Sequence, residues 1–353
     1  MNKKLLAVAI AGALAAPYAM ADEGNVTISG NLSASVSSVK TKVNSYWTSY
    51  DYVNDEYGYG EDSRSDRASD VSPGGSDLTI SGWENLGNGL KAVFLLKTWV
   101  NVTGNAGGGG GSDLLFGPNK DAYLGLQGNF GTVALGAHGQ PYKTATDGLE
   151  LFGDTIGDAR GSVTNGLGAF HSGIGDAVIW FLPNMNGFSG HLQYGTENGV
   201  DGGANPWGAQ FNYSNGPLYV TYAHADNDAG TDGNKVGVGY SFGDTTVNGI
   251  IERTDNGGDD VTAWSLGLAQ KFGANTLKAQ YARNDLGDDQ SLWALGLDHS
   301  LSKRTTLFAL YADGKNMSKE SSSYSLDDDL VGTWTYTETQ FNNGFEVGIK
   351  HSF

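Results

Sequence analysis

The histidines are the first residues to weigh, because a histidine can act as a general base, as the partner of a nucleophile or as a metal ligand. Six histidines are spread along the chain, at positions 138, 171, 191, 224, 299 and 351. They form neither an H-E-x-x-H run nor the Ser-His-Asp order of hydrolases. The sequence therefore predicts no catalytic centre, no nucleotide and no redox cofactor.

Carboxylates gather in several short runs, and oxygen-rich runs of this kind are candidate calcium ligands. The runs are Asp226-Asn227-Asp228, Asp255 with Asp259-Asp260, Asp285 with Asp288-Asp289, and Asp327-Asp328-Asp329. None has the spacing of an EF-hand loop. We expect solvated acidic loops without a metal cofactor, and we keep Ca²⁺ binding there as an alternative.

Four further acids, Asp147, Glu150, Asp154 and Asp158, lie close together in a glycine-rich segment, residues 139–173. The whole chain of 353 residues has a formal net charge of −18, from 21 Lys and Arg against 39 Asp and Glu. So acidic a chain repels phosphate backbones, which argues against nucleic-acid binding.

The composition limits the elements that can position these side chains. With 54 Gly and 11% aromatic residues, the chain is unfavourable for long helices and too aromatic for disorder. No run of 18 apolar residues is present, so a bundle of membrane-spanning helices is excluded. An all-β fold remains.

The N-terminus has the order of an export signal. Asn2-Lys3-Lys4 is positively charged, residues 5–16 are mostly apolar, and Ala19-Met20-Ala21 is a small-residue cleavage site. We predict a signal peptide over residues 1–21 and one mature domain over residues 22–353. Cleavage removes two lysines and no acid, so the exported chain is still more acidic.

Most of the mature sequence alternates with a period of two, which is the pattern of a β-strand with two different faces. In residues 236–242, valine, tyrosine and phenylalanine occupy one face, while glycine and serine occupy the other. Residues 262–272 and 291–301 repeat this pattern. The sequence predicts strands with one apolar face and one face of small or polar side chains.

Connections of two sizes alternate between these strands. Short ones have hairpin chemistry, as in Asn186-Gly187. Long ones, rich in Asp, Asn, Gly and Tyr, are expected near residues 40–76, 104–119, 139–173, 199–206, 227–234, 255–260, 285–290 and 314–339. The segments between them number about sixteen, which predicts a closed transmembrane antiparallel β-barrel in the outer membrane of a Gram-negative bacterium.

A soluble β-sandwich is the alternative fold, because its strands also alternate. The strict rhythm of short and long connections favours the barrel. The C-terminal strand also ends on Phe353, which resembles the signal by which outer-membrane proteins are recognised for insertion. We expect this strand to close the barrel against the first one, residues 26–36.

Three stretches in the right order resemble the Gram-negative general porins of the neisserial and β-proteobacterial type. They are SDLTISGWENLGNGLKAVFLLKTW at 76–99, LFG followed by DAYLGLQGNFGTVALG within 115–136, and DAVIWFLPNMNGFSGHLQYG at 176–195. The resemblance implies a homotrimer of sixteen-stranded barrels, each a water-filled channel for passive diffusion of ions and small hydrophilic solutes. It also implies that a third loop, here residues 139–173, folds inward and narrows the pore.

The sequence departs from the family pattern where the family places bases. Asp77 and Ser81 stand at an arginine and a lysine of the second strand, Ala137 and Ile179 stand at later arginines, and Lys97 replaces a glutamate. The acids of the third loop are kept. Because charges in a narrow pore enrich counter-ions, we predict a channel that prefers cations.

Alternation also assigns the expected pore lining. Polar candidates on the inward side are Asp77, Ser81, Lys97 and His138, and His138 is expected to line the pore and not to act as a base. Apolar candidates are Trp83, Val93, Leu95, Ile179 and Phe181. These apolar residues would form a track for amphiphilic solutes, or pack under the third loop, or face outward if a bulge shifts the register.

Two alternatives of other classes stay open. An outer-membrane barrel enzyme is the first. The second is a channel for sugar-like solutes or an adhesin, because residues 40–76 hold six Tyr and Trp residues that could stack on sugars. We expect these aromatics to contact solvent and lipopolysaccharide, and the outer wall of the barrel to contact outer-membrane lipids.

Overall fold

One antiparallel sheet makes up most of the described chain. The computed structural model describes residues 24–51, 53–54, 56–103, 116–196, 204–255, 258, 260–287, 289–326 and 331–353. The predicted signal peptide, residues 1–21, lies outside these ranges and stays a prediction. In the described ranges, no helix is long and apolar enough to cross a membrane.

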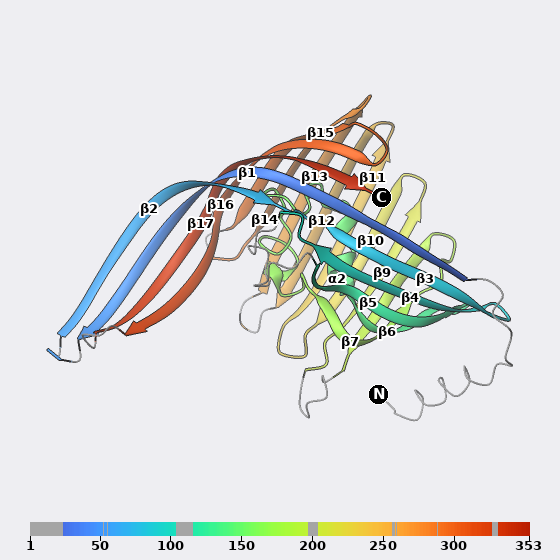
Figure 1. The fold of residues 1–353 in the computed structure, drawn as a ribbon, viewed down its shortest axis with the longest axis horizontal. Coiled ribbons are helices and arrows are strands. Elements are labelled where there is room, and N and C mark those ends of the chain that lie inside the picture. Colours follow the sequence, from blue (N-terminus) through green and yellow to red (C-terminus); the bar gives the residue numbers. More distant parts are fainter. Residues whose placement is uncertain are drawn as a thin grey trace.

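Seventeen strand segments form this sheet (Figure 1). They are β1 (Gly24–Asp51), β2 (Glu56–Ser72), β3 (Asp77–Gly87), β4 (Leu90–Val100), β5 (Phe116–Gly128), β6 (Gly131–Gly139), β7 (Gly173–Phe181), β8 (Phe188–Gly195), β9 (Trp207–Asn215), β10 (Leu218–Asp226), β11 (Asp232–Phe242), β12 (Thr245–Asp255), β13 (Asp260–Phe272), β14 (Asn275–Asn284), β15 (Ser291–Ser300), β16 (Thr305–Leu326) and β17 (Val331–Ser352). Between β6 and β7 lie three short helical turns, α2 (Pro141–Thr144), η1 (Asp147–Leu149) and η2 (Gly166–Gly168).

The sheet closes on itself as a barrel of sixteen strands, as predicted. β1 pairs with β17, and the backbone of Phe353 exchanges two hydrogen bonds with Gly30. β2 and β3 both pair with β1, along its residues 35–51 and 24–31. They are therefore two parts of one strand that is interrupted at residues 73–76.

The two faces of the wall differ as the period of two predicted. On β11, Val236, Val238 and Tyr240 are exposed on the outer face, while Gly237 and Gly239 are buried on the inner face. Apolar side chains on the outer face are favourable where the barrel wall contacts lipid. The small inner side chains leave room inside the barrel, and part of this room is filled by the segment between β6 and β7.

The prediction of long loops is wrong for two segments. Residues 40–76 and 314–339 are mostly strand, because β1, β2, β16 and β17 continue far beyond the barrel. These strands could not be recognised from the sequence because their side chains are mostly polar or aromatic on both faces. The alternation that marks a strand with one apolar face is therefore missing.

These extensions form a four-stranded arm, defined as residues 41–51, 56–66, 317–326 and 331–341. The arm curves away from the barrel (Figure 1). It begins where the register shifts, between Lys40 and Thr41 against β17 and between Asp313 and Met317 of β16. Such irregularities bend a strand and increase its twist, which accounts for the bend at the base of the arm.

Candidate functional site

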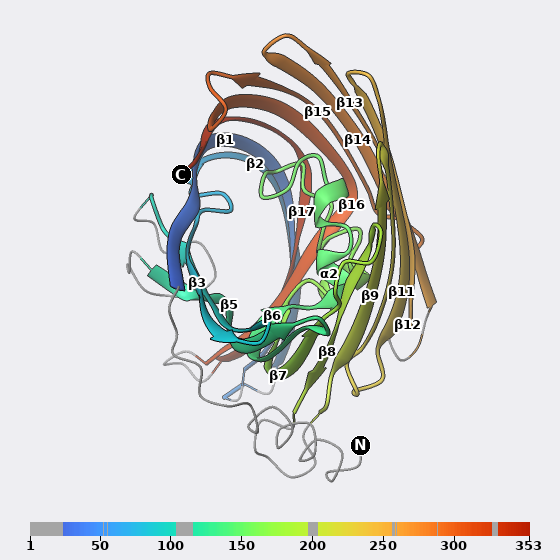
Figure 2. The ribbon, with the colours of Figure 1, turned by 90° about the vertical axis from the view of Figure 1, so that its right-hand side faces the viewer.

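The segment between β6 and β7, residues 140–172, lies inside the barrel. Figure 2 shows it within the ring of strands, against the wall formed by β9 to β16. Its side chains fill spaces above inner-face glycines: a Cβ added to Gly237 would lie 2.6 Å from Leu149, and one added to Gly296 would lie 2.6 Å from Phe152. The inner face of this wall therefore has glycine where the segment packs.

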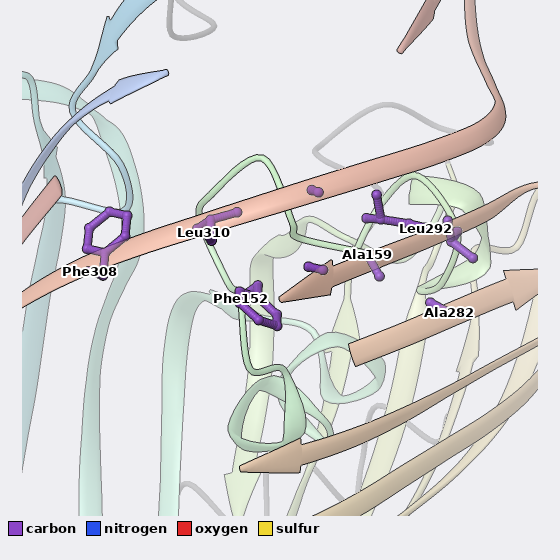
Figure 3. Packing of buried hydrophobic residues seen from close by; sticks show 9 residues of the cluster. Phe152, Ala159, Ala282, Leu292, Phe308 and Leu310 are labelled. Carbon is purple, nitrogen blue, oxygen red and sulfur yellow. The ribbon is translucent and has the colours of Figure 1, made fainter. Parts of the chain in front are cut away.

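A hydrophobic cluster holds the middle of this segment to the wall. Phe152, Ala159 and Val163 pack against inner-face residues of β14, β15 and β16, among them Leu292 and Leu310 (Figure 3). Phe152 is 1% exposed. Burial of a phenylalanine side chain contributes about 1.5–3 kcal/mol, so this cluster stabilises the inward position of the segment.

Overfilling this contact should displace the segment. We expect Gly296→Val to lower stability by about 1–3 kcal/mol, because the new side chain needs space that Phe152 occupies. The measurement is the urea midpoint of the folded barrel. Gly249→Ala on the outer face of β12 is the control, since its Cβ would come only within 3.3 Å of Leu266. Equal midpoints for Gly296→Val and the wild type would contradict the packing described here.

A buried ion pair holds the end of the same segment. Lys235 Nζ on β11 lies 3.3 Å from Glu252 Oε2 on β12, with the two side chains 0% and 1% exposed. The backbone N–H of Gly166 donates to Glu252 Oε1 at 3.0 Å. Lys235 also donates to the side chains of Thr146 and Asn165, and its Nζ lies 4.0 Å from the ring centre of Tyr142. The pair thus connects the segment to the wall at several points.

Arg160 binds three of the four acids that the sequence analysis singled out in the segment. Its guanidinium lies 2.8 Å from Asp147, 2.7 Å from Asp158 and 3.4 Å from Asp154. Burial opposes its charge, but the hydrogen bonds to Asp158 and the charges of Asp147 and Asp154 are stronger and raise the pKa of Arg160. Three carboxylates around one arginine leave a negative local charge.

Glu150, the fourth acid, lies against the wall and not in the arginine cluster. Its Oε1 accepts hydrogen bonds from Gln280 of β14 and from the backbone of Phe152. Burial and the neighbouring charge of Asp158 raise the pKa of Glu150 to about 7. This carboxyl therefore changes its charge near neutral pH.

The facing wall carries a second chain of charged groups. Lys97 on β4 lies 3.2 Å from Asp77 on β3, and His138 on β6 lies 2.9 Å from Asp121 on β5. Lys97 and Asp121 are direct cross-strand partners. Of these four residues, Asp77, Lys97 and His138 were predicted from the sequence, and Asp121 was not. Alternation with Tyr123 could have revealed it.

The register places the apolar candidates on the inner face. Trp83 pairs with Val93, Leu95 pairs with Ser81, and Ser81 lies on the same face as Asp77. These residues therefore share one face of the two strands with Asp77 and Lys97.

The apolar candidates differ in what covers them. Ile179 is 0% exposed in a cluster with Ala134, Ile174 and Ala177, so its side chain does not contact solvent in the barrel. Phe181 lies among Tyr123, His138 and His191, with ring centres 5.2 to 5.5 Å away. Trp83 has the ammonium of Lys91 4.3 Å from its ring centre.

Two lysines of the inner face escaped the sequence analysis. Lys278 of β14 pairs with Asp298 at 2.9 Å and donates to the carbonyl of Leu151, and Lys350 of β17 donates to the carbonyl of Gly153. Both contact the backbone of the inward segment. The period of two places both lysines on the inner face, but their contacts with the inward segment depend on the tertiary structure.

In the described part of the chain, the candidate calcium loops form no cation site. Among the described residues, no group of three or more His, Asp or Glu could hold a metal ion. Asp259, Asp288 and residues 327–329 lie outside the described ranges.

Comparison with known proteins agrees with the barrel. The pattern that defines the family "Gram-negative porin" matches residues 6–319. Outer membrane porin protein 32 of Delftia acidovorans is 30% identical over the full length of both chains. Major outer membrane protein P.IB of Neisseria gonorrhoeae is 30% identical over 63% of this chain and 56% of its own.

Solved porins share the fold. The structure titled anion-selective porin from Comamonas acidovorans has a TM-score of 0.63 at 23% identity and covers 94% of this chain and 100% of its own. OmpT of Vibrio cholerae has a TM-score of 0.62 at 14% identity, covering 96% of this chain and 100% of its own. The family match, the full-length relative and the closed barrel together place this chain in the Gram-negative porin family, as a channel protein of the outer membrane and not an enzyme.

Proposed function

We propose that this porin forms a homotrimeric channel through which ions and small hydrophilic solutes diffuse passively, with a preference for cations. In this proposal residues 139–173 form the constriction, and Asp147, Glu150, Asp154 and Asp158 set its charge. Asp77, Ser81, Trp83, Lys97, His138 and Phe181 line the facing wall. The outer wall contacts outer-membrane lipids, and the exposed loops contact lipopolysaccharide.

One observation supports the cation preference above others: two of the acids that bind Arg160 are more exposed than Arg160 itself. Asp147 and Asp154 expose 37% and 46% of their side chains, whereas Arg160 exposes 11%. Lys278 is 15% exposed and lies against the segment backbone. A passing ion thus meets carboxylates before guanidinium or ammonium groups, and a narrow passage strengthens their field.

Two observations argue against a cation preference. Lys97 is 28% exposed while its partner Asp77 is only 6% exposed, so this wall presents a base. The Comamonas acidovorans porin is anion-selective by its title, but at 23% identity it informs on the fold alone. Residues 139–173 themselves hold four acids against Lys143 and Arg160, and this balance supports the cation preference.

The test is a reversal potential measured across a planar bilayer in a KCl gradient, with single-channel conductance recorded in the same experiment. We expect ohmic single-channel steps and a potassium to chloride permeability ratio above one. A ratio below one would refute the cation preference while leaving the channel intact. The absence of any steps would refute the open channel itself.

Glu150 adds a pH dependence to this selectivity. Because its pKa is raised to about 7, it is mostly neutral at pH 6 and mostly ionised at pH 8. We expect the potassium to chloride ratio to rise between these two pH values, and Glu150→Gln to remove most of this rise. An unchanged pH profile in Glu150→Gln would contradict the assignment.

A second candidate function follows from the inner-face aromatics. Trp83, Tyr123 and Phe181 lie on the same face as Lys97 and Asp121, which suits solutes that carry both charge and an apolar part. Liposome swelling separates the two functions. A specific channel would admit phenylalanine faster than a neutral sugar of the same size, whereas a general porin would not.

A further inference from the structure

We propose that one face of the arm is a binding surface for neutral polysaccharide outside the cell. The arm is formed by both hairpins that continue beyond the barrel, β1–β2 and β16–β17 (Figure 1). Their tips lie at the end of the barrel that carries the long connections, which faces the medium in outer-membrane barrels. With eleven residues of β1 beyond the bend, the arm is about 35 Å long.

The strand register gathers aromatic side chains on a single face of the arm. Residues that pair directly across strands point to the same side of a sheet. One row across the four strands is Glu61, Tyr46, Tyr336 and Ser322. The next row is Tyr59, Thr48, Trp334 and Tyr324, followed by Tyr57 and Tyr50. Seven aromatic rings from all four strands therefore share one face.

These rings are unusually accessible for aromatic side chains. Tyr57 and Tyr59 are 84% and 88% exposed, and Trp334 is 60% exposed. Neighbouring rings lie beside one another: the centres of Tyr324 and Trp334 are 4.9 Å apart, and those of Tyr50 and Tyr57 are 4.7 Å apart. Aromatic side chains offer a large rigid surface that loses little conformational entropy on binding.

The chemistry of this face fits sugars better than proteins or lipids. Its central row has no charged side chain, although the whole chain has a net charge of −18. Tyrosine hydroxyls, Thr48 and Ser322 lie between the rings, and the Glu61 carboxylate ends one row. Apolar C–H faces of pyranose rings stack on aromatic rings, and their hydroxyls need such donors and acceptors. An anionic ligand is disfavoured by the charge of the chain.

The β2 edge of the arm argues against addition of a strand from another protein. In the described part of the chain, β2 pairs with β1 alone, so its other edge is unpaired. This edge strand carries Glu56, Glu61, Asp62, Arg64 and Asp66. Charged residues on edge strands prevent edge-to-edge association. The aromatic face, and not the edge, is therefore the surface available to a ligand.

The opposite face gives a matched control. Trp47 points to that side, where the rings of its side chain cover Gly60: a Cβ on Gly60 would lie 2.3 Å from the indole. Trp47 lies on β1, as do Tyr46 and Tyr50 of the aromatic face, and is 39% exposed. Its removal takes an indole from the arm without touching the aromatic face.

The experiment titrates the full-length protein, in a detergent without a sugar headgroup, with linear neutral hexasaccharides: α-linked glucose, β-linked glucose and β-linked N-acetylglucosamine. Isothermal titration calorimetry reports binding, because Trp334, the tryptophan of the aromatic face, is replaced in two of the variants. We expect at least one hexasaccharide to bind, Tyr59→Ala/Trp334→Ala to weaken it at least tenfold, and Trp47→Ala to leave it within about twofold. Tyr59→Phe/Trp334→Phe keeps the ring faces and should retain binding. Single-channel conductance should be the same in all four proteins, with no block by the sugar.

Several outcomes would overturn the proposal. Binding of no hexasaccharide, or equal loss in Trp47→Ala and the double alanine variant, would refute the aromatic surface. Binding only to lipopolysaccharide would assign the face to the cell's own membrane, and binding to phosphatidylethanolamine vesicles would make it a lipid contact. Sugar block of the current with unchanged binding in the arm variants would place the sugar in the pore. A failed pore measurement, in contrast, bears on the proposed channel and not on the arm.

Discussion

Glu252→Gln is expected to destabilise the barrel by about 3–5 kcal/mol, which is the largest effect of any substitution considered for this protein. The amide keeps the hydrogen bond from Gly166 but removes the only carboxylate within 4 Å of the buried Lys235 ammonium in the described chain. A buried charge without a partner costs several kcal/mol. The measurement is urea unfolding of the barrel in lipid vesicles, followed by tryptophan fluorescence.

A double variant separates the charge effect from packing. Lys235→Met/Glu252→Gln removes both charges and leaves a side chain of similar length at position 235, so most of the lost stability should return. Should the single and the double variant unfold at the same urea concentration, the ion pair would not be the cause of the loss. Wild-type stability in Glu252→Gln would show that Lys235 finds another partner or water.

The second large effect concerns ion selectivity. Asp147→Asn/Asp154→Asn leaves Arg160 with Asp158 as its remaining acidic partner, so the local charge becomes neutral. A unit charge acts on an ion 4 Å away with about 1 kcal/mol in water, which corresponds to roughly fivefold in a permeability ratio. Because two such charges are removed, we expect the potassium to chloride ratio to fall by at least about fivefold, measured by reversal potential in a KCl gradient.

The control removes the same number of charges from the end of the barrel. Asp226 and Asp232 are cross-strand partners on β10 and β11, at the end that carries the long connections and outside the inward segment. Asp226→Asn/Asp232→Asn should change the ratio less than twofold, because salt screens charges beyond about 10 Å. Equal shifts in the two double variants would mean that overall charge, and not the inward segment, sets the selectivity. Raising the salt concentration should reduce the effect in the Asp147→Asn/Asp154→Asn channel.

Much of the barrel could be predicted because the physical rule behind it is local. Alternation of Val236, Val238 and Tyr240 with glycine needs only neighbouring residues, and it correctly gave the faces of β11. The same rule failed for residues 40–76 and 314–339, because the arm has no apolar face to reveal its period. Its two hairpins, β1–β2 and β16–β17, are held together by the pairing of β1 with β17, whose partners, such as Asp51 and Val331, lie far apart in the sequence.

The candidate site was predictable only in part. The acidic character of residues 139–173 could be predicted from composition. The inward side of Asp77 and Lys97 could be predicted from alternation along their strands. Their partners could not: Arg160 among three carboxylates, Lys278 beside Leu151, and Lys235 with Glu252 depend on where a loop lies against strands far along the chain. Electrostatic interactions depend on distance and burial, and neither quantity is encoded in local spacing.

By itself, the sequence determined the class of this protein: acidic, cysteine-free, strand-forming, with lipid-facing side chains that repeat every second residue and turns that alternate in length. Those properties depend on residues that are neighbours in the chain, so they can be recognised from the sequence alone. Tertiary structure alone decided which inner charges remain exposed, because that depends on the segment packed at Phe152 and Arg160. It likewise decided that the two polar, aromatic stretches pair into one arm, since hydrogen bonds between distant strands, and not the pattern within each strand, create that surface.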